Sequence, residues 1–179
     1  TILAWKYFLD TLSKEKRDKC QLVLHTTPVD EHGTDLPEVI RFLFPNEDHN
    51  IVISAGKFST EQMSYLYNYV DGTILLSSAE GWGLALTESL LTGTPIIANV
   101  TGGMQDQMRF EDKDSNWIEF NSNFPSNHRG TYKKHGEWAL PVYPSNLSLV
   151  GSPRTPYIWD DRCNAEDAAK QIEALYNMG

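Results

Sequence analysis

The sequence predicts a doubly wound α/β fold, in which a Rossmann-like parallel sheet carries helices on both faces. Four short apolar runs lie in the first hundred residues, and none shows the polar alternation of a half-exposed strand. Segments with a helical period separate these runs, which is the order of successive βαβ units. Ligands of such folds bind beyond the carboxyl ends of the strands, so this edge of the sheet is where function is expected.

The predicted elements follow one another with ordinary turn and cap signals between them. The strands are Gln21–His25, Asn50–Ser54, Thr73–Ser77 and Pro95–Asn99. The helices are 2–18, Leu36–Phe44 with Thr34 or Asp35 as its cap, a helix opened by Ser59 or Thr60 with Glu61 in its first turn, Leu84–Leu91, and Ala165–Met178. Pro45 and Gly93 are the expected stop signals.

The chain is expected to form one domain, residues 1–179, in three parts. Residues 1–110 are the regular α/β core, 111–160 an irregular segment with one short strand at Trp117–Phe120, and 161–179 a C-terminal helix. A long irregular stretch inside a compact domain is usually functional or packs against another domain. For 111–160 we expect only a packing role.

Composition excludes several classes of partner. The formal net charge is −9, which argues against nucleic acid as a partner. No apolar run reaches the about 20 residues of a transmembrane segment, and no stretch of this sequence resembles a signal peptide. Cys20 and Cys163 lie in no motif, so a reducing, cytoplasmic setting is expected. The sequence begins inside an amphipathic pattern without an initiator Met, so we expect a fragment of a longer chain.

The third strand end carries the residues best suited to chemistry. Gly81 and Gly83 allow a sharp turn and a close approach to a ligand, and the following helix directs free N–H groups at a phosphate. Glu80 in the loop and Glu88 in the helix can each accept two hydroxyl donors, as the vicinal hydroxyls of a sugar present them. Alternatively, Glu88 stabilises the helix through its dipole alone.

The order of motifs resembles retaining glycosyltransferases of the GT-B fold, family 4 (group 1) type, in their C-terminal donor-binding domain. The resemblance covers residues 1–108, with the stretch Glu80–Glu88, the Gly93-Thr-Pro strand start and Gly102-Gly103 in sequence. It implies a nucleotide-diphosphate sugar as donor, transfer to an acceptor hydroxyl with the anomeric configuration kept, and no cofactor or metal ion. The acceptor proton then passes to the leaving phosphate.

The resemblance also implies roles for individual residues. Glu80 would contact the donor hexose at the reacting centre, and Glu88 would hold the ribose hydroxyls. The remaining donor-binding residues are Gly81, Trp82, Gly83 and Leu84 at the sugar and diphosphate, Gly102 and Gly103 in the same cleft, and Lys57 and Phe58 near the base. Two parts of the family pattern are absent, namely a basic pair before the first helix and an N-terminal acceptor-binding domain. The isolated chain is therefore expected to be inactive.

Other readings of the same residues stay open or fail on spacing. A nucleotide-sugar epimerase of the GT-B fold and a non-catalytic nucleotide-sugar-binding module remain alternatives. Asp112-Lys113-Asp114 matches a metal-binding Asp-x-Asp motif, but it lies in a charged loop. Gly56-Lys57-Phe58 lacks the first Gly and the hydroxyl residue of a P-loop. No His spacing predicts a metal site.

Overall fold

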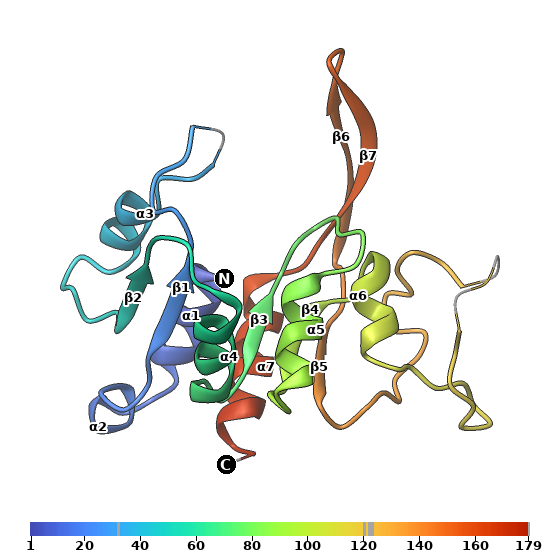
Figure 1. Ribbon diagram of the computed structural model, residues 1–179, viewed down its shortest axis with the longest axis horizontal. Coiled ribbons are helices and arrows are strands. Elements are labelled where there is room, and N and C mark those ends of the chain that lie inside the picture. The colour runs from blue at the N-terminus through green and yellow to red at the C-terminus, as the bar shows by residue number, and fades with distance from the viewer. Residues whose placement is uncertain (32, 120, 122–123, 179) are drawn as a thin grey trace.

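A computed structural model describes residues 1–31, 33–119, 121 and 124–178 (Figure 1). Its elements, in chain order, are α1 (Ile2–Asp10), α2 (Lys14–Arg17), β1 (Leu22–His25), α3 (Leu36–Leu43), β2 (Ile51–Ser54), α4 (Thr60–Tyr69), β3 (Thr73–Leu75), α5 (Leu84–Leu91), β4 (Ile96–Asn99), α6 (Gly102–Gln107), β5 (Ala139–Val142), β6 (Asn146–Ser152), β7 (Thr155–Arg162) and α7 (Ala165–Tyr176).

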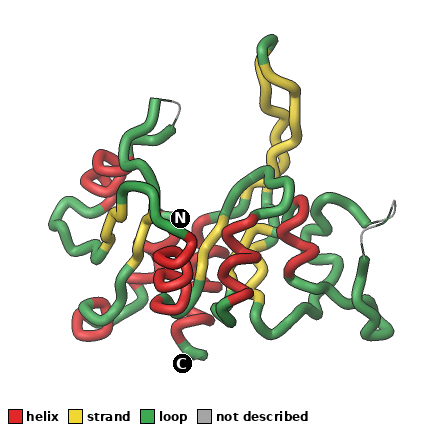
Figure 2. The backbone as a smooth tube through the Cα atoms, viewed as in Figure 1, coloured by secondary structure: helices red, strands yellow, loops and turns green. Residues whose placement is uncertain are grey.

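The predicted doubly wound α/β class is confirmed. Strands β1 and β2 form one parallel pair, and β3, β4 and β5 form a parallel three-stranded sheet with β4 in the middle. In the smoothed trace, red helices lie in front of and behind the yellow strands (Figure 2). Strands β4 and β5 are buried throughout and β3 is half-buried, because helices cover both faces of the sheet. This burial explains the apolar runs without polar alternation.

Two apolar clusters fill the two sides of the sheet. On one side, Ile97 and Leu140 pack with α1 and α7. On the other side, Ile96 packs with Leu86 of α5 and Met104 of α6. The first cluster also contains residues of β1 and β2, so a shared core joins the two groups of strands.

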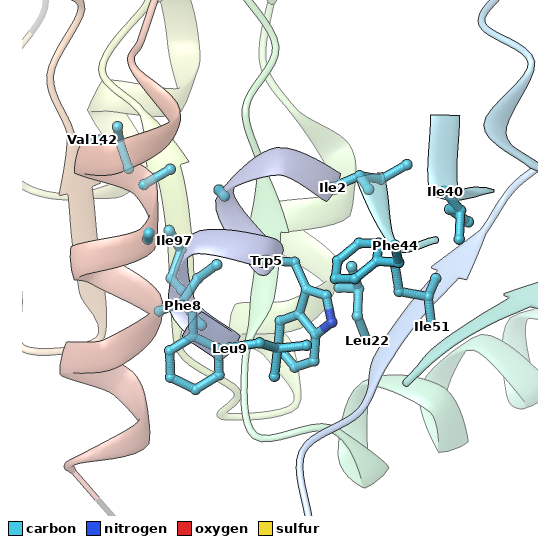
Figure 3. Close-up of a cluster of buried hydrophobic side chains, with 14 of the residues drawn as sticks. Ile2, Trp5, Phe8, Leu9, Leu22, Ile40, Phe44, Ile51, Ile97 and Val142 are labelled. Carbon is cyan, nitrogen blue, oxygen red and sulfur yellow. The ribbon is translucent and has the colours of Figure 1, made fainter. Parts of the chain in front are cut away.

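Helix α1 is the centre of the first cluster. Figure 3 shows Trp5 beside Leu22 and Phe44, with Phe8 and Leu9 along the same helix face. The indole Nε1 of Trp5 donates a hydrogen bond of 2.7 Å to the carbonyl of His49. This bond satisfies the polar end of a buried ring and links α1 to the loop before β2.

The predicted N-caps of α3 and α4 are confirmed, whereas the predicted helix at the N-terminus is corrected. The Asp35 carboxylate accepts from the Glu38 amide, and Ser59 forms a capping box with Gln62. The predicted helix 2–18 is wrong as one element, because it divides into α1 and α2. The Thr11 hydroxyl donates to the Phe8 carbonyl at 2.8 Å, which takes up an acceptor at the end of α1.

The predicted irregular segment 111–160 is also corrected, because it contains β5, β6 and most of β7. Strand β5 holds Pro141, which removes a backbone donor. Among the described strands β5 pairs only with β4, so its other edge needs no donor. At the predicted strand Trp117–Phe120 the structure has a single bridge between Glu111 and Trp117. Phe120 lies outside the described residues.

Strands β6 and β7 form an antiparallel ribbon that rises from the carboxyl edge of the sheet (Figure 1). Leu149 lies opposite Trp159, and both are exposed on the same face. The register shifts between Val150 and Ser152, where Gly151 packs under Tyr157. The ribbon therefore extends beyond the core with apolar side chains on its surface.

A buried histidine organises the aromatic residues between α6 and β5. The ring of His128 is 4.2 Å from the ring of Phe110 and 5.6 Å from that of Tyr143, and the residue is 4 % exposed. Its Nδ1 accepts from the amides of Gly130 and Tyr132, so the ring proton is on Nε2. Burial, with a smaller contribution from nearby Lys133, lowers the pKa of His128 from 6.5 to about 4.

We expect the His128→Gln variant to lose part of the acid sensitivity of the fold. The unfolded chain binds a proton at His128 below about pH 6.5, whereas the folded chain does so only near pH 4. The stability that the neutral ring contributes is therefore complete above pH 6.5 and is lost as the pH falls toward 4. Urea unfolding at several pH values measures this. If the free energy of unfolding depended on pH equally in the variant and the wild type, the lowered pKa of His128 would be contradicted.

Candidate functional site

The candidate site lies at the carboxyl edge of the sheet, where the loop after β3 leads into α5. This loop, Ser78–Gly83, lies between the end of β3 and the first turn of α6 (Figure 1). Its last residue, Gly83, is the N-cap of α5 and has a φ of 85°, a left-handed conformation that glycine adopts without strain. No side chain caps α5, so its first amides remain free for a ligand.

Gly102 and Gly103, which were predicted to line the cleft, form the first turn of α6. The Gly103 amide donates 3.2 Å to the Gly81 carbonyl. A Cβ at Gly102 would overlap the Glu80 carbonyl, and one at Gly103 would overlap the Gly81 carbonyl and the Trp82 ring. The two glycines are needed because the helix backbone lies directly on the loop backbone.

The two carboxylates of the motif have different environments. Glu80 is half-buried in the loop, whereas Glu88 is exposed on α5. The hydroxyl of buried Tyr67 on α4 donates to Glu88 Oε2 at 2.9 Å. Burial, and then this hydrogen bond, raise the pKa of Tyr67 to about 12, so it is a neutral donor at physiological pH. Glu88 thus has a structural partner, which the sequence did not predict.

Trp82 and Leu84 present apolar surface beside the loop. Trp82 is 46 % exposed, and its Nε1 donates to the Thr87 hydroxyl at 2.8 Å. Leu84 is exposed in the first turn of α5. An aromatic face with a satisfied polar end can contact a sugar or base without rearrangement.

Lys57 and Phe58 lie at another part of the same edge, after β2. Both are exposed, and the Phe58 ring lies with its centroid 4.3 Å from that of His25, at the end of β1, in a tilted arrangement. The structure therefore divides the predicted residues into a joined group around α5 and α6 and a separate pair over β1 and β2.

A buried polar cluster, which sequence reasoning missed, fixes the ribbon to this edge. The Asn99 amide donates to the carbonyls of Ser77 and Asp161, and the Thr101 hydroxyl donates to Asp161 Oδ2 at 2.7 Å. The Asp161 amide donates to the Ser78 carbonyl at 2.7 Å. In the sequence this cluster is marked by Asn99 at the end of an apolar strand, and the sequence does not indicate which residues Asn99 contacts.

An open hollow of about 340 Å³ adjoins Ser78. Its walls come from the end of β3 and from the first turns of α1 and α7, and they include Arg162. Neither α1 nor α7 has a side-chain N-cap. The first turn of α7 brings backbone amides and one arginine to this hollow, although Glu166 and Asp167 lie in the same turn.

Comparison with known proteins supports a glycosyl transferase. Residues 42–123 match the family model described as glycosyl transferases group 1. The matched part runs from the end of α3 past α6, so it contains the Glu80–Glu88 stretch and both glycines of α6. A search of curated proteins found no match.

Two further features of the described residues bear on the kind of protein. No helix among them is long and apolar enough to cross a membrane. Within the same residues, no group of three or more His, Cys, Asp or Glu side chains is arranged to hold a metal ion. The absence of a metal requirement remains a prediction.

We expect Gly103→Ala to destabilise the protein by about 1–3 kcal/mol, because its methyl group would overlap the loop backbone. Gly81→Ala is the matched control, since no atom lies near its Cβ position and its φ is not positive. This control should stay within about 0.5 kcal/mol of the wild type. Urea unfolding of the three proteins measures the difference, and equal losses in both variants would contradict the contact described.

Proposed function

We propose that this chain is the donor-binding domain of a retaining glycosyltransferase, which transfers a sugar from a nucleotide-diphosphate sugar to an acceptor hydroxyl. The observation that carries the proposal is the arrangement of the Glu80–Gly83 loop. The loop places a carboxylate, an exposed indole and an uncapped helix N-terminus together at the carboxyl edge of the sheet. This arrangement lies inside the segment that is similar to group 1 glycosyl transferases.

The diphosphate of the donor would bind where free backbone amides gather. The first turn of α5 supplies one set, and the first turn of α7 would supply another beside Arg162 in the hollow next to Ser78. Arg162 forms an ion pair of 3.4 Å with Asp160. It is a cation at the proposed phosphate position that sequence reasoning did not name. Local positive groups are needed because the chain as a whole carries a net charge of −9.

Glu88 would hold the ribose hydroxyls while it keeps its bond to Tyr67. An ionised carboxylate has two oxygens with about four acceptor positions, and the Tyr67 hydroxyl uses one of them. The side chain is exposed, so the other positions are accessible. The bond from Tyr67 would also orient the carboxylate before the ligand arrives.

Glu80 would contact the transferred hexose at the reacting centre. In the proposed reaction the bond between the anomeric carbon and the diphosphate oxygen breaks, and the acceptor oxygen bonds to the same face of that carbon. The acceptor proton goes to the leaving phosphate, so neither a protein nucleophile nor a metal ion is required. A second, N-terminal domain would bind the acceptor and complete the enzyme, and the free Cys20 and Cys163 are compatible with a cytoplasmic setting.

We expect Glu88→Gln to weaken donor binding about tenfold, because an amide accepts hydroxyl donors less strongly than a carboxylate does. Saturation-transfer NMR against UDP-, GDP- and ADP-sugars measures binding and identifies the base. Glutamine retains an acceptor for Tyr67, so the fold is expected to survive. Tyr67→Phe is the control, since it removes the internal bond but keeps the carboxylate.

The outcomes separate the proposal from its competitors. Equal binding by Glu88→Gln and the wild type would exclude the ribose role. If the full-length protein gave no saturation-transfer signal with any of the three nucleotide sugars, a binding site for these donors would be excluded. Binding with inversion at a sugar carbon of the free nucleotide sugar, and no transfer, would identify an epimerase. Binding without any turnover of the full-length protein would identify a non-catalytic module.

A further inference from the structure

Gln107, the last residue of α6, is a buried amide whose contacts all lead to the candidate site. It is 7 % exposed. Its Nε2 donates to the carbonyl of Trp82 at 2.5 Å and to that of Gly83 at 3.3 Å. Its Oε1 accepts from the Thr87 hydroxyl at 2.8 Å. One side chain thus contacts the end of the Glu80–Gly83 loop and the first part of α5.

These contacts close into a ring through Trp82. The Trp82 indole donates to the Thr87 hydroxyl, which donates to Gln107, which donates back to the Trp82 carbonyl. Every direction in the ring is fixed. The Trp82 indole can only donate, so the Thr87 hydroxyl accepts from it and donates its own proton to Gln107. The Trp82 carbonyl can only accept, so the Gln107 amide nitrogen must face it. The ring therefore selects one orientation of the indole and one conformation of the loop.

The backbone of Gln107 is itself anchored. The Trp138 indole donates to the Gln107 carbonyl at 3.0 Å, just before β5 begins. At the other end of α6, Gly103 lies against Gly81 and the Trp82 ring. Both ends of helix α6 therefore contact the loop. The first turn of the helix does so through its glycine backbone, and the last residue does so through the Gln107 amide.

We propose that Gln107 is a positioning residue for the donor site, acting through Trp82 and the Gly83 turn and not through contact with the ligand. This inference rests on the proposed function, because it takes the Glu80–Gly83 loop to be the part that contacts the donor. A preformed loop loses little conformational entropy when a ligand binds, so loss of the ring lowers donor affinity. A packing role for Gln107 would affect stability without affecting Trp82.

The test compares Gln107→Glu with Gln105→Glu, the same change at a neighbouring buried glutamine of α6. Gln105 donates to the Pro125 carbonyl, a contact outside the Gln107 ring. Thr87→Val and Thr87→Ser form a second pair, in which only serine keeps the hydroxyl. The indole N–H resonance of Trp82, identified among the five tryptophans by Trp82→Phe, reports on the ring without any ligand.

The expected result is that the Trp82 indole resonance shifts in Gln107→Glu and Thr87→Val and stays in place in Gln105→Glu and Thr87→Ser. Saturation-transfer NMR should then show donor affinity about tenfold lower in the first two variants alone. If Gln107→Glu fails to fold, the Thr87 pair decides the same question.

Two results would overturn the inference. One is an unmoved Trp82 resonance in the folded Gln107→Glu and Thr87→Val variants. The other is a shifted resonance with unchanged donor affinity. A wild type that binds no nucleotide sugar would instead overturn the proposed function, and the Trp82 resonance would still report whether Gln107 holds the loop.

Discussion

The contact between the first turn of α6 and the backbone of Glu80–Trp82 is the constraint on which the candidate site depends. At Gly102 and Gly103 there is no room for a Cβ, so helix and loop meet through main-chain atoms. Main-chain contact leaves the loop little freedom to shift. It also explains how an exposed loop can hold its groups in a fixed arrangement for a ligand, since the buried helix α6 supports the loop backbone.

The same edge of the sheet collects segments that lie far apart in the chain. Asn99 and Thr101, at the end of β4, bond to Asp161 at the base of the ribbon, and the Asp161 amide bonds to Ser78 beside the loop. The ribbon, the loop and the start of α6 are therefore parts of one hydrogen-bonded assembly. Because most of these groups are buried, breaking any one bond would leave its partner unsatisfied, which costs more than the bond itself contributes.

The sequence predicted what depends on local pattern and missed what depends on distant partners. Strands β1 to β4 and the caps Asp35 and Ser59 follow from apolar runs and from short polar side chains before helices. The motif located Glu80 and Glu88 because their spacing is local. Pro141, Gly151 and Pro156 obscured the patterns of strands β5, β6 and β7. The roles of Gln107 and Asp161 come from contacts made across twenty or more residues. No periodicity encodes such contacts.

The β6–β7 ribbon has a consequence for how this protein behaves at high concentration. It is only two strands wide, so each strand has an edge with unpaired backbone groups, and Leu149, Tyr157 and Trp159 add apolar surface. Such edges can recruit strands of other molecules and start aggregation. Pro156, which lacks an N–H, and the register shift at Gly151 interrupt the regular ladder that a foreign strand would need. Pro156 and Gly151, which obscured the strand pattern in the sequence, therefore also disfavour pairing of the ribbon with other molecules.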